Sequence, residues 1–370
     1  MVVALLVAAV LAAPPAAPAV RALPIQDSPI VLTIQPRSHT VKLTCAVDRG
    51  RAHTCSRSPR FKVSPGRHSV SVRGLDRRGR ASARRTVTVI VPQREPAGVP
   101  AGGEPVGIAT ANGLVWVSNG SSGTVSAIDP AVRHNVSTFR VGGQLGGIVA
   151  GGEAVWVSDF GGGSVVKIDP ALSVVVGRIA VGGRPTGLAL DAAGSLWVGN
   201  LDGYVSRIDP VLGRVAAQLP LPSGVSQPLF ARGLVWLGLQ NGSIVAVDPE
   251  TNRLTGASVS VASDVDALAA TPSGLWVSTF AGIAALVDPD RRVVIRRVTL
   301  PSRGSGVSFA GGSVWVSAYD SGLVLRLDPA TGALLGAVHT GPELRESVEA
   351  GGALWVANQL NGTVTPVPLG

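Results

Sequence analysis

The fold is decided by residues 115–130, VWVSNGSSGTVSAIDP, because close variants of this stretch recur down the chain. Each copy contains one tryptophan, and neighbouring tryptophans are 39 to 41 residues apart: Trp116, Trp156, Trp197, Trp236, Trp276, Trp315 and Trp355. An Asp-Pro pair follows each of the first six tryptophans, whereas the seventh copy ends in Thr365-Pro366. Residues 105–370 therefore contain seven copies of one unit.

Each copy divides into four short segments that are separated by turns. In the first copy these segments begin with PVGIA at residues 105–109, continue through VWVS and TVSAID, and end before a Gly-Gly pair. Four short strands in a period of about 40 residues predict a β-propeller, in which each blade buries its faces only against its neighbours. We therefore expect an all-β fold with a seven-bladed β-propeller.

The last copy stops before its fourth strand, and the sequence ahead of the first copy offers a replacement. Residues 94–109, REPAGVPAGGEPVGIA, align without gaps on residues 174–189, VVVGRIAVGGRPTGLA. We expect the propeller to span residues 94–370 and to be closed by the strand near residues 94–101. Closure of this kind removes the open sheet edges that would otherwise aggregate.

The repeated stretch, continued as FRVGGQLGGIVA, resembles the YVTN-type repeat of bacterial seven-bladed propellers. Tryptophan replaces the leading tyrosine of that repeat, and Asp-Pro replaces Asp-Thr. The resemblance covers residues 94–370 and implies a surface-associated binding or scaffold protein. It implies no particular ligand, because one fold serves many functions.

Residues 28–92 have the alternation of a small β-sandwich, with Pro, Gly and Asp in the turns. The stretch from Cys45 to Ser82 resembles a bacterial Ig-like module. Cys45 and Cys55 are the only cysteines, and in an exported protein we expect them to form a disulfide across a hairpin. A metal site is the alternative, but His53 would not complete its four ligands.

Residues 1–20, MVVALLVAAVLAAPPAAPAV, have the pattern of a signal peptide or membrane anchor. The apolar run is short for a bilayer span, and Ala17-Pro18-Ala19 resembles a signal-peptidase site. No Lys or Arg precedes the apolar run, so both alternatives stay open. We expect a secreted or cell-surface protein in either case.

The net charge of +9 is unevenly divided along the chain. Residues 1–95 contain 16 Lys and Arg against 4 Asp and Glu, whereas residues 96–370 contain 16 against 19. The basic Ig-like module is expected to contact an anionic surface, although a merely solvated basic face is the alternative. No aromatic residues alternate with its arginines, so we expect no specific nucleic acid partner.

Function is expected where the copies differ from one another. In a propeller, the loops between second and third strands and the loops before the first strands meet at one mouth of the central channel. The candidate ligand-binding residues in these loops are Asn119, Asp159, Phe160, Arg184, Asn200, Asp202, Phe280, Arg303, Tyr319 and Asp320. The same loops also contain Gln227, Arg345 and Glu346. The aromatic residues predict a polar and aromatic binding rim, unless they only cap the blade ends.

An enzyme is the alternative class, because streptogramin lyase is also a seven-bladed propeller and uses histidine, glutamate and magnesium on its innermost strands. The corresponding segments of this sequence contain no histidine, and their only glutamates are Glu346 and Glu349. We therefore expect no catalytic residue and no cofactor. Asp264 and Asp266 are weak candidates for a metal ion, because two carboxylates leave most ligands to water.

The expected molecule is a monomeric binding protein whose partner is a protein or a cell-wall glycan. A second alternative is the extracellular sensor domain of a membrane-tethered regulator. This alternative depends on whether the apolar segment at residues 1–20 is a retained anchor.

Overall fold

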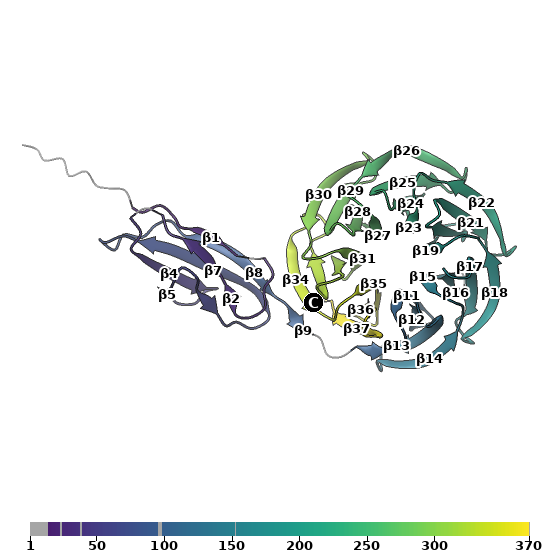
Figure 1. Cartoon of the computed structure of the whole chain (residues 1–370), viewed down its shortest axis with the longest axis horizontal. Helices are drawn as coiled ribbons and strands as arrows, with labels where there is room; N and C mark the ends of the chain where they lie inside the picture. Colours follow the sequence, from purple (N-terminus) through teal and green to yellow (C-terminus); the bar gives the residue numbers. More distant parts are fainter. Residues whose placement is uncertain (1–13, 23, 38, 95–97, 152, 370) are drawn as a thin grey trace, which may run out of the picture. The chain divides into compact units, whose positions relative to one another are not determined.

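The structure is a computed structural model that describes residues 14–22, 24–37, 39–94, 98–151 and 153–369. It divides into two compact units, Met1–Gln93 and Arg94–Gly370 (Figure 1). All regular elements of the described residues are β-strands and none is a helix, so the expected all-β class is confirmed. Accordingly, this part of the chain holds no helix capable of crossing a membrane. Residues 1–13 of the expected leader lie outside the described residues.

The N-terminal unit contains three antiparallel sheets around one core. Their strand orders are β5-β4-β7-β8, β1-β3 and β2-β6. The strands are β1 (Ala19–Arg21), β2 (Ile30–Val31), β3 (Thr33–Gln35), β4 (Lys42–Val47), β5 (His53–Thr54), β6 (Arg60–Phe61), β7 (Gly66–Leu75) and β8 (Arg85–Val91). β9 (Gln93–Arg94) lies at the division between the units.

The expected disulfide between Cys45 and Cys55 is confirmed, and their Cα atoms are 5.8 Å apart. Cys45 is fully buried on β4 and packs with Val70, Val72 and Val89 in the core of this unit. A disulfide is consistent with an extracellular location, because such bonds persist in oxidising compartments.

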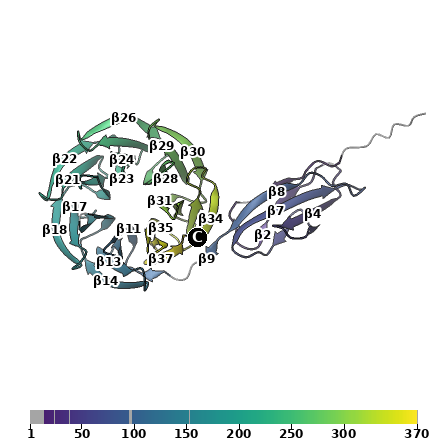
Figure 2. The ribbon, with the colours of Figure 1, turned by 180° about the vertical axis from the view of Figure 1, so that it is seen from behind.

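The C-terminal unit consists of repeated antiparallel sheets in a ring (Figures 1 and 2). Four of them are β11–β14 (Pro105–Ala111, Leu114–Asn119, Thr124–Asp129, His134–Arg140), β15–β18 (Leu145–Gly151, Ala154–Asp159, Ser164–Asp169, Val174–Ala180), β19–β22 (Pro185–Leu190, Leu196–Asn200, Tyr204–Asp209, Arg214–Pro220) and β23–β26 (Val225–Ala231, Leu234–Leu239, Ser243–Asp248, Arg253–Ser260). The others are β27–β30 (Val265–Thr271, Gly274–Thr279, Ile283–Asp288, Val293–Thr299), β31–β34 (Gly304–Ala310, Ser313–Ala318, Leu323–Leu327, Leu334–His339) and β35–β37 (Leu344–Ala350, Ala353–Asn358, Thr363–Pro368) with β10 (Val99–Pro100).

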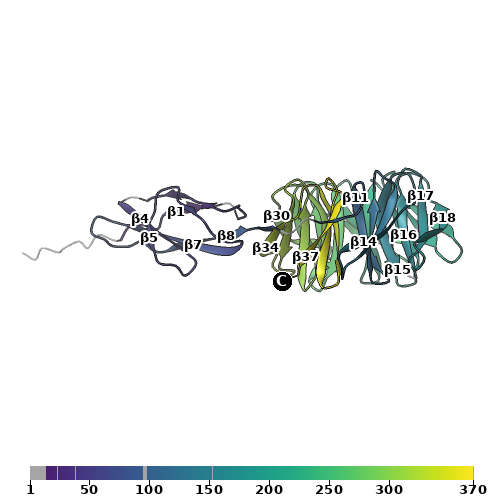
Figure 3. The ribbon, with the colours of Figure 1, turned by 90° about the horizontal axis from the view of Figure 1, so that it is seen from below.

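The first strand of each sheet lies at the inside of the ring, and the last strand lies outside (Figure 1). Successive first strands contact one another, and β35 contacts β11. The outer strand beside β37 is β10, with Val99 opposite Val364. Seen from the side, the strands run across the thickness of the ring (Figure 3). This arrangement is consistent with a β-propeller.

The tryptophans hold neighbouring sheets together. Trp116 is fully buried on β12 and packs with Val155 and Ile168 of the following sheet. Its indole N–H donates to the main-chain oxygen of Ala111 at 3.2 Å. A large aromatic ring that is buried with its polar N–H hydrogen-bonded contributes strongly to the stability of a hydrophobic core. This contribution explains why the sequence repeats the tryptophan in every copy.

The Asp-Pro pairs and the serines that follow the tryptophans also have structural roles. Asp129 Oδ1 accepts the main-chain N–H of Ala131 at 2.8 Å, which stabilises the turn after the third strand. Ser118 Oγ donates to the main-chain oxygen of Gly146 on the next first strand at 2.6 Å. Ser158 makes the same bond to Thr186. These bonds fix the first strands that surround the channel.

Candidate functional site

A cavity of about 380 Å³ lies at one end of the ring, where the loops before the first strands and the turns after the second strands meet. We call this end the mouth. Phe160 and Phe280 line the cavity from two of the turns, and Asp266 and Glu346 line it from the first strands β27 and β35. The cavity therefore combines aromatic and ionisable groups from sheets that are distant in sequence.

Aromatic rings and guanidinium groups alternate beside this cavity. The Arg303 guanidinium carbon lies 4.8 Å from the centre of the Tyr319 ring and 5.5 Å from that of Phe280. The Arg345 guanidinium carbon lies 4.9 Å from the centre of the Tyr319 ring. Cations at these distances are attracted to the ring faces. We call Phe280, Arg303, Tyr319, Asp320, Arg345 and Gln359 the rim cluster.

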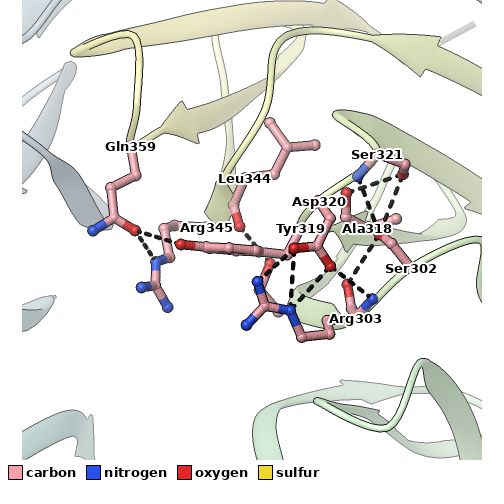
Figure 4. Close-up of polar contacts among 10 residues, drawn as sticks. Ser302, Arg303, Ala318, Tyr319, Asp320, Ser321, Leu344, Arg345 and Gln359 are labelled. Carbon is pink, nitrogen blue, oxygen red and sulfur yellow. Dashed lines mark hydrogen bonds and ion pairs between the residues drawn. The ribbon is translucent and has the colours of Figure 1, made fainter.

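Polar contacts fix both arginines of the rim cluster (Figure 4). Arg303 Nε donates to Asp320 Oδ2 at 3.0 Å, and Arg303 Nη2 contacts Asp320 Oδ1. This bidentate bond lowers the pKa of Asp320. Arg345 Nε donates to Gln359 Oε1 at 2.6 Å, and the Tyr319 hydroxyl donates to the same oxygen at 3.4 Å. Burial raises the pKa of Tyr319, so this hydroxyl keeps its proton at neutral pH.

Two carboxyl groups on the first strands have raised pKa values. Burial raises the pKa of Asp266 to about 6, opposed by Arg345 and reinforced by Asp264. Burial also raises the pKa of Glu346 to about 7, opposed by the main chain of Ile108 and by Arg345, and reinforced by Asp266. Glu346 therefore keeps its proton to a higher pH than a solvent-exposed glutamate does.

Gln227 connects Glu346 to a distant part of the ring. Its Nε2 donates to Glu346 Oε1 at 3.4 Å, although the two residues lie on β23 and β35. Its Oε1 accepts the main-chain N–H of Leu268 on β27 at 2.8 Å. The amide thus positions one carboxyl of the channel relative to two other sheets.

The sequence candidates Asn119, Asp159 and Asn200 are buried at equivalent positions in their sheets. Asn119 Nδ2 donates to the main-chain oxygen of Ala101 at 3.0 Å, and Asn200 Nδ2 donates to that of Gly182 at 3.0 Å. Asp159 pairs with Arg178 and accepts the main-chain N–H of Gly162. These side chains hold adjacent loops in place and are buried away from the surface of the mouth.

The remaining sequence candidates lie on the rim. Arg184 pairs with Asp202 at 2.7 Å, and both side chains are exposed. This pair does not line the cavity, whereas Phe160 and Phe280 do. Tyr319, Asp320 and Arg303 belong to the rim cluster.

The structure offers the two weak metal candidates little help. Asp264 is exposed and Asp266 is half-buried. Within the part of the chain that the structure describes, no group of three or more His, Cys, Asp and Glu side chains is placed to hold a metal ion. A cation bound by these two aspartates would depend on other ligands.

Sequence reasoning placed Gln227, Arg345 and Glu346 near the mouth without selecting them. A signal was present, because Gln227 and Glu346 stand where other first strands have glycine, as in Gly187 and Gly306. Close packing requires glycine at position 306, since a Cβ on Gly306 would lie 2.4 Å from the Arg345 main-chain oxygen. Long polar side chains at such positions therefore mark a local exception in the repeat.

Comparisons with known proteins support the fold. No family model matches the chain, and no curated protein sequence matches it. Among solved structures, it is similar to hydrazine synthase of Kuenenia stuttgartiensis, a β-propeller-containing protein. That similarity has a TM-score of 0.66 and 15% sequence identity, and it covers 72% of this chain and 96% of that chain. At this identity the likeness concerns the fold alone.

Proposed function

We propose that the chain is an exported, non-enzymatic binding or scaffold protein at the cell surface, and that the mouth is its binding site. The observation that carries this proposal is the cavity at the mouth, whose lining differs from sheet to sheet while the surrounding strands repeat. Concave sites that combine apolar rings with a few fixed polar groups are typical of ligand binding. The partner is a protein or a cell-wall glycan.

The finer architecture belongs to the same proposal. The ring is a seven-bladed YVTN-type propeller that closes by pairing β10 with β37, and the N-terminal unit is an Ig-like β-sandwich. The repeated sheets and the contact of β35 with β11 support the first part. The core shared by β4, β7 and β8 supports the second.

A streptogramin-lyase-like reaction receives no support from the lining of the cavity. The described residues that line it include no histidine, whereas the lyase mechanism uses one. General acid or base catalysis needs a titratable group within hydrogen-bond reach of the substrate. Asp266 and Glu346 are titratable, but a binding role accounts for them equally well.

The N-terminal unit has a separate basic surface that could contact an anionic partner. Arg49, Arg73 and Arg84 line a cavity of about 440 Å³ beside β4 and β7. Of the nearby acids, Asp48 pairs with His68 and Asp76 pairs with Arg80. The excess positive charge supports contact with an anionic polymer of the cell surface. Its strength should fall as salt concentration rises, which a binding titration at several salt concentrations would measure.

Sedimentation of the full-length protein with isolated cell walls tests the binding site. We expect F160A and F280A each to weaken binding by about tenfold, because aromatic anchors dominate binding energies. Protease treatment of the walls distinguishes a protein partner from a glycan. V211S is the matched control, since Val211 is 91% exposed in the turn after a third strand.

Two results of this experiment would contradict the proposal. Binding that F160A and F280A leave unchanged would remove the mouth as the site. Turnover of a streptogramin by the protein would remove the non-enzymatic assignment.

A further inference from the structure

We propose that the mouth selects a glycan that carries a carboxylate, and that Arg345 binds this carboxylate. The inference rests on the proposed function, because it specifies the ligand of the same site. Its basis is the position of Arg345, which lines the cavity and belongs to the rim cluster.

Two contacts hold the guanidinium group of Arg345, one on its face and one at its Nε edge. The Tyr319 ring covers the face, and Gln359 accepts the Nε proton. The two terminal nitrogens make no hydrogen bond to any residue that the structure describes, and they point away from Gln359 (Figure 4). A guanidinium held in this way presents a preorganised pair of N–H donors, which matches a carboxylate.

The other rim arginines are already occupied. Arg303 makes a bidentate contact with Asp320, and Arg184 pairs with Asp202. Arg345 is the one arginine among the described residues that line the cavity. It is therefore the residue best placed to receive an anionic group of a ligand.

The acids near Arg345 do not neutralise it through direct contact. Asp266 raises the pKa of Glu346, and Arg345 lowers the pKa of both acids. Within the described residues, however, no ion pair of 4.0 Å or less joins Arg345 to either acid. The space between these groups suits a ligand that accepts from Arg345 and also accepts from a protonated carboxyl.

The rest of the lining is suited to a sugar. Gln144, Gln240 and Gln359 contribute amides, which both donate and accept hydrogen bonds and so match hydroxyl groups. Phe160 and Phe280 contribute flat apolar surfaces that can pack against a sugar ring. A phosphate would also fit a guanidinium, but its second charge would face Asp266 and Glu346.

Two matched pairs of sugars test the proposal by calorimetry with the full-length protein. N-acetylmuramic acid differs from N-acetylglucosamine by a lactyl carboxylate, and glucuronic acid differs from glucose by a carboxylate. We expect the acidic member of at least one pair to bind about tenfold to a hundredfold more tightly, as charged hydrogen bonds allow. Glucose 6-phosphate tests the phosphate alternative.

Variants assign the preference to Arg345. R345Q should abolish the preference for the acidic sugar, and R345K should retain only part of it, because lysine keeps the charge but lacks the paired donors. R214Q is the matched control and should behave as the native protein does, because Arg214 is exposed on the outer strand β22 and does not line the cavity. Unchanged melting temperatures would show that the variants fold.

The pH dependence gives a second readout. Protonated Glu346 and Asp266 favour a bound carboxylate, so affinity should fall as pH rises through about 6 and 7. The charged groups that act on these two acids are Arg345 and Asp264, and a third acid, Glu104, also lines the cavity. Affinity that instead rises with pH would indicate a cationic ligand and overturn the proposal.

The remaining outcomes separate this inference from the proposed function. A preference that survives in R345Q, tighter binding of the phosphate, or no binding of either acidic sugar would overturn the inference. If cell-wall binding still depends on Phe160 and Phe280, the proposed function stands without it. If F160A and F280A leave cell-wall binding unchanged, the mouth is not the binding site, and the proposed function is contradicted whatever the sugars do.

Discussion

Glu346 places a titratable carboxyl at a first-strand position that is occupied by glycine in most other copies of the repeat. Four of the first strands have glycine here, and β35 has a carboxyl whose burial raises the pKa to about 7. The ordinary value is 4.5. The folded protein therefore binds this proton more tightly than the unfolded chain does.

The free energy of unfolding should consequently depend on pH through Glu346. Its contribution is complete below about pH 4.5 and is lost as pH rises to about 7. We expect E346Q to remove most of this decline, because glutamine carries no proton that titrates. Urea unfolding at several pH values in this range measures the free energy of unfolding of the native protein and of E346Q. If the free energy of unfolding fell equally with pH in the two proteins, the prediction would be contradicted.

Asp248 provides a control of opposite sign. The main-chain N–H of Glu250 lowers the pKa of Asp248 below its ordinary value of 3.8. Its contribution to stability is therefore present above that value and is lost as pH falls through the folded pKa. D248N should change the unfolding curve only at the acidic end and leave the range affected by E346Q unchanged.

At the scale of the element, the first strands are packed closely enough to require glycine at several positions. A Cβ on Gly306 would lie 2.4 Å from the Arg345 main-chain oxygen and 2.9 Å from the Glu346 Cα. A methyl group there must therefore displace β35 and the two mouth residues that it holds.

G306A should destabilise the ring by about 1–3 kcal/mol, as overpacking usually does. It should also weaken ligand binding at the mouth, because Arg345 moves with its strand. G177A is the matched control, since the nearest atom to its Cβ would be 3.7 Å away. Chemical unfolding measures both variants, and equal stability of the two would show that β35 adapts freely.

The strands were easier to predict from the sequence than the contacts of the mouth. The tryptophan period and the Asp-Pro turns are local signals, and they predicted the all-β class correctly. Asn119 and Asp159 were expected on the rim, but their side chains are buried against neighbouring loops. The contacts of Arg345 with Tyr319 and Gln359 join different turns and sheets. No local pattern reveals such pairings, because they depend on how two repeats pack.

At the scale of the whole molecule, the two units have separate hydrophobic cores. The disulfide lies entirely in the N-terminal unit, where Cys45 belongs to the core. A cross-link stabilises mainly by restricting the unfolded chain that contains it. Its loss should therefore affect one unit only.

Reduction should destabilise the N-terminal unit by about 2–4 kcal/mol. Calorimetry with and without a phosphine reductant should show one unfolding transition shifted to lower temperature. The transition of the ring serves as the internal control and should stay in place. Equal shifts of both transitions would mean that the units unfold together.

The exceptional residues on the first strands have an evolutionary consequence. The backbone of the ring is periodic, but the chemistry of the mouth is concentrated in a few copies, with Asp266 on β27 and both Arg345 and Glu346 on β35. Selection for a ligand would then act on the first strands of these copies and leave the first strands that carry glycine constrained by packing. Related sequences should preserve a non-periodic signature at Asp266, Arg345 and Glu346, superimposed on the tryptophan repeat.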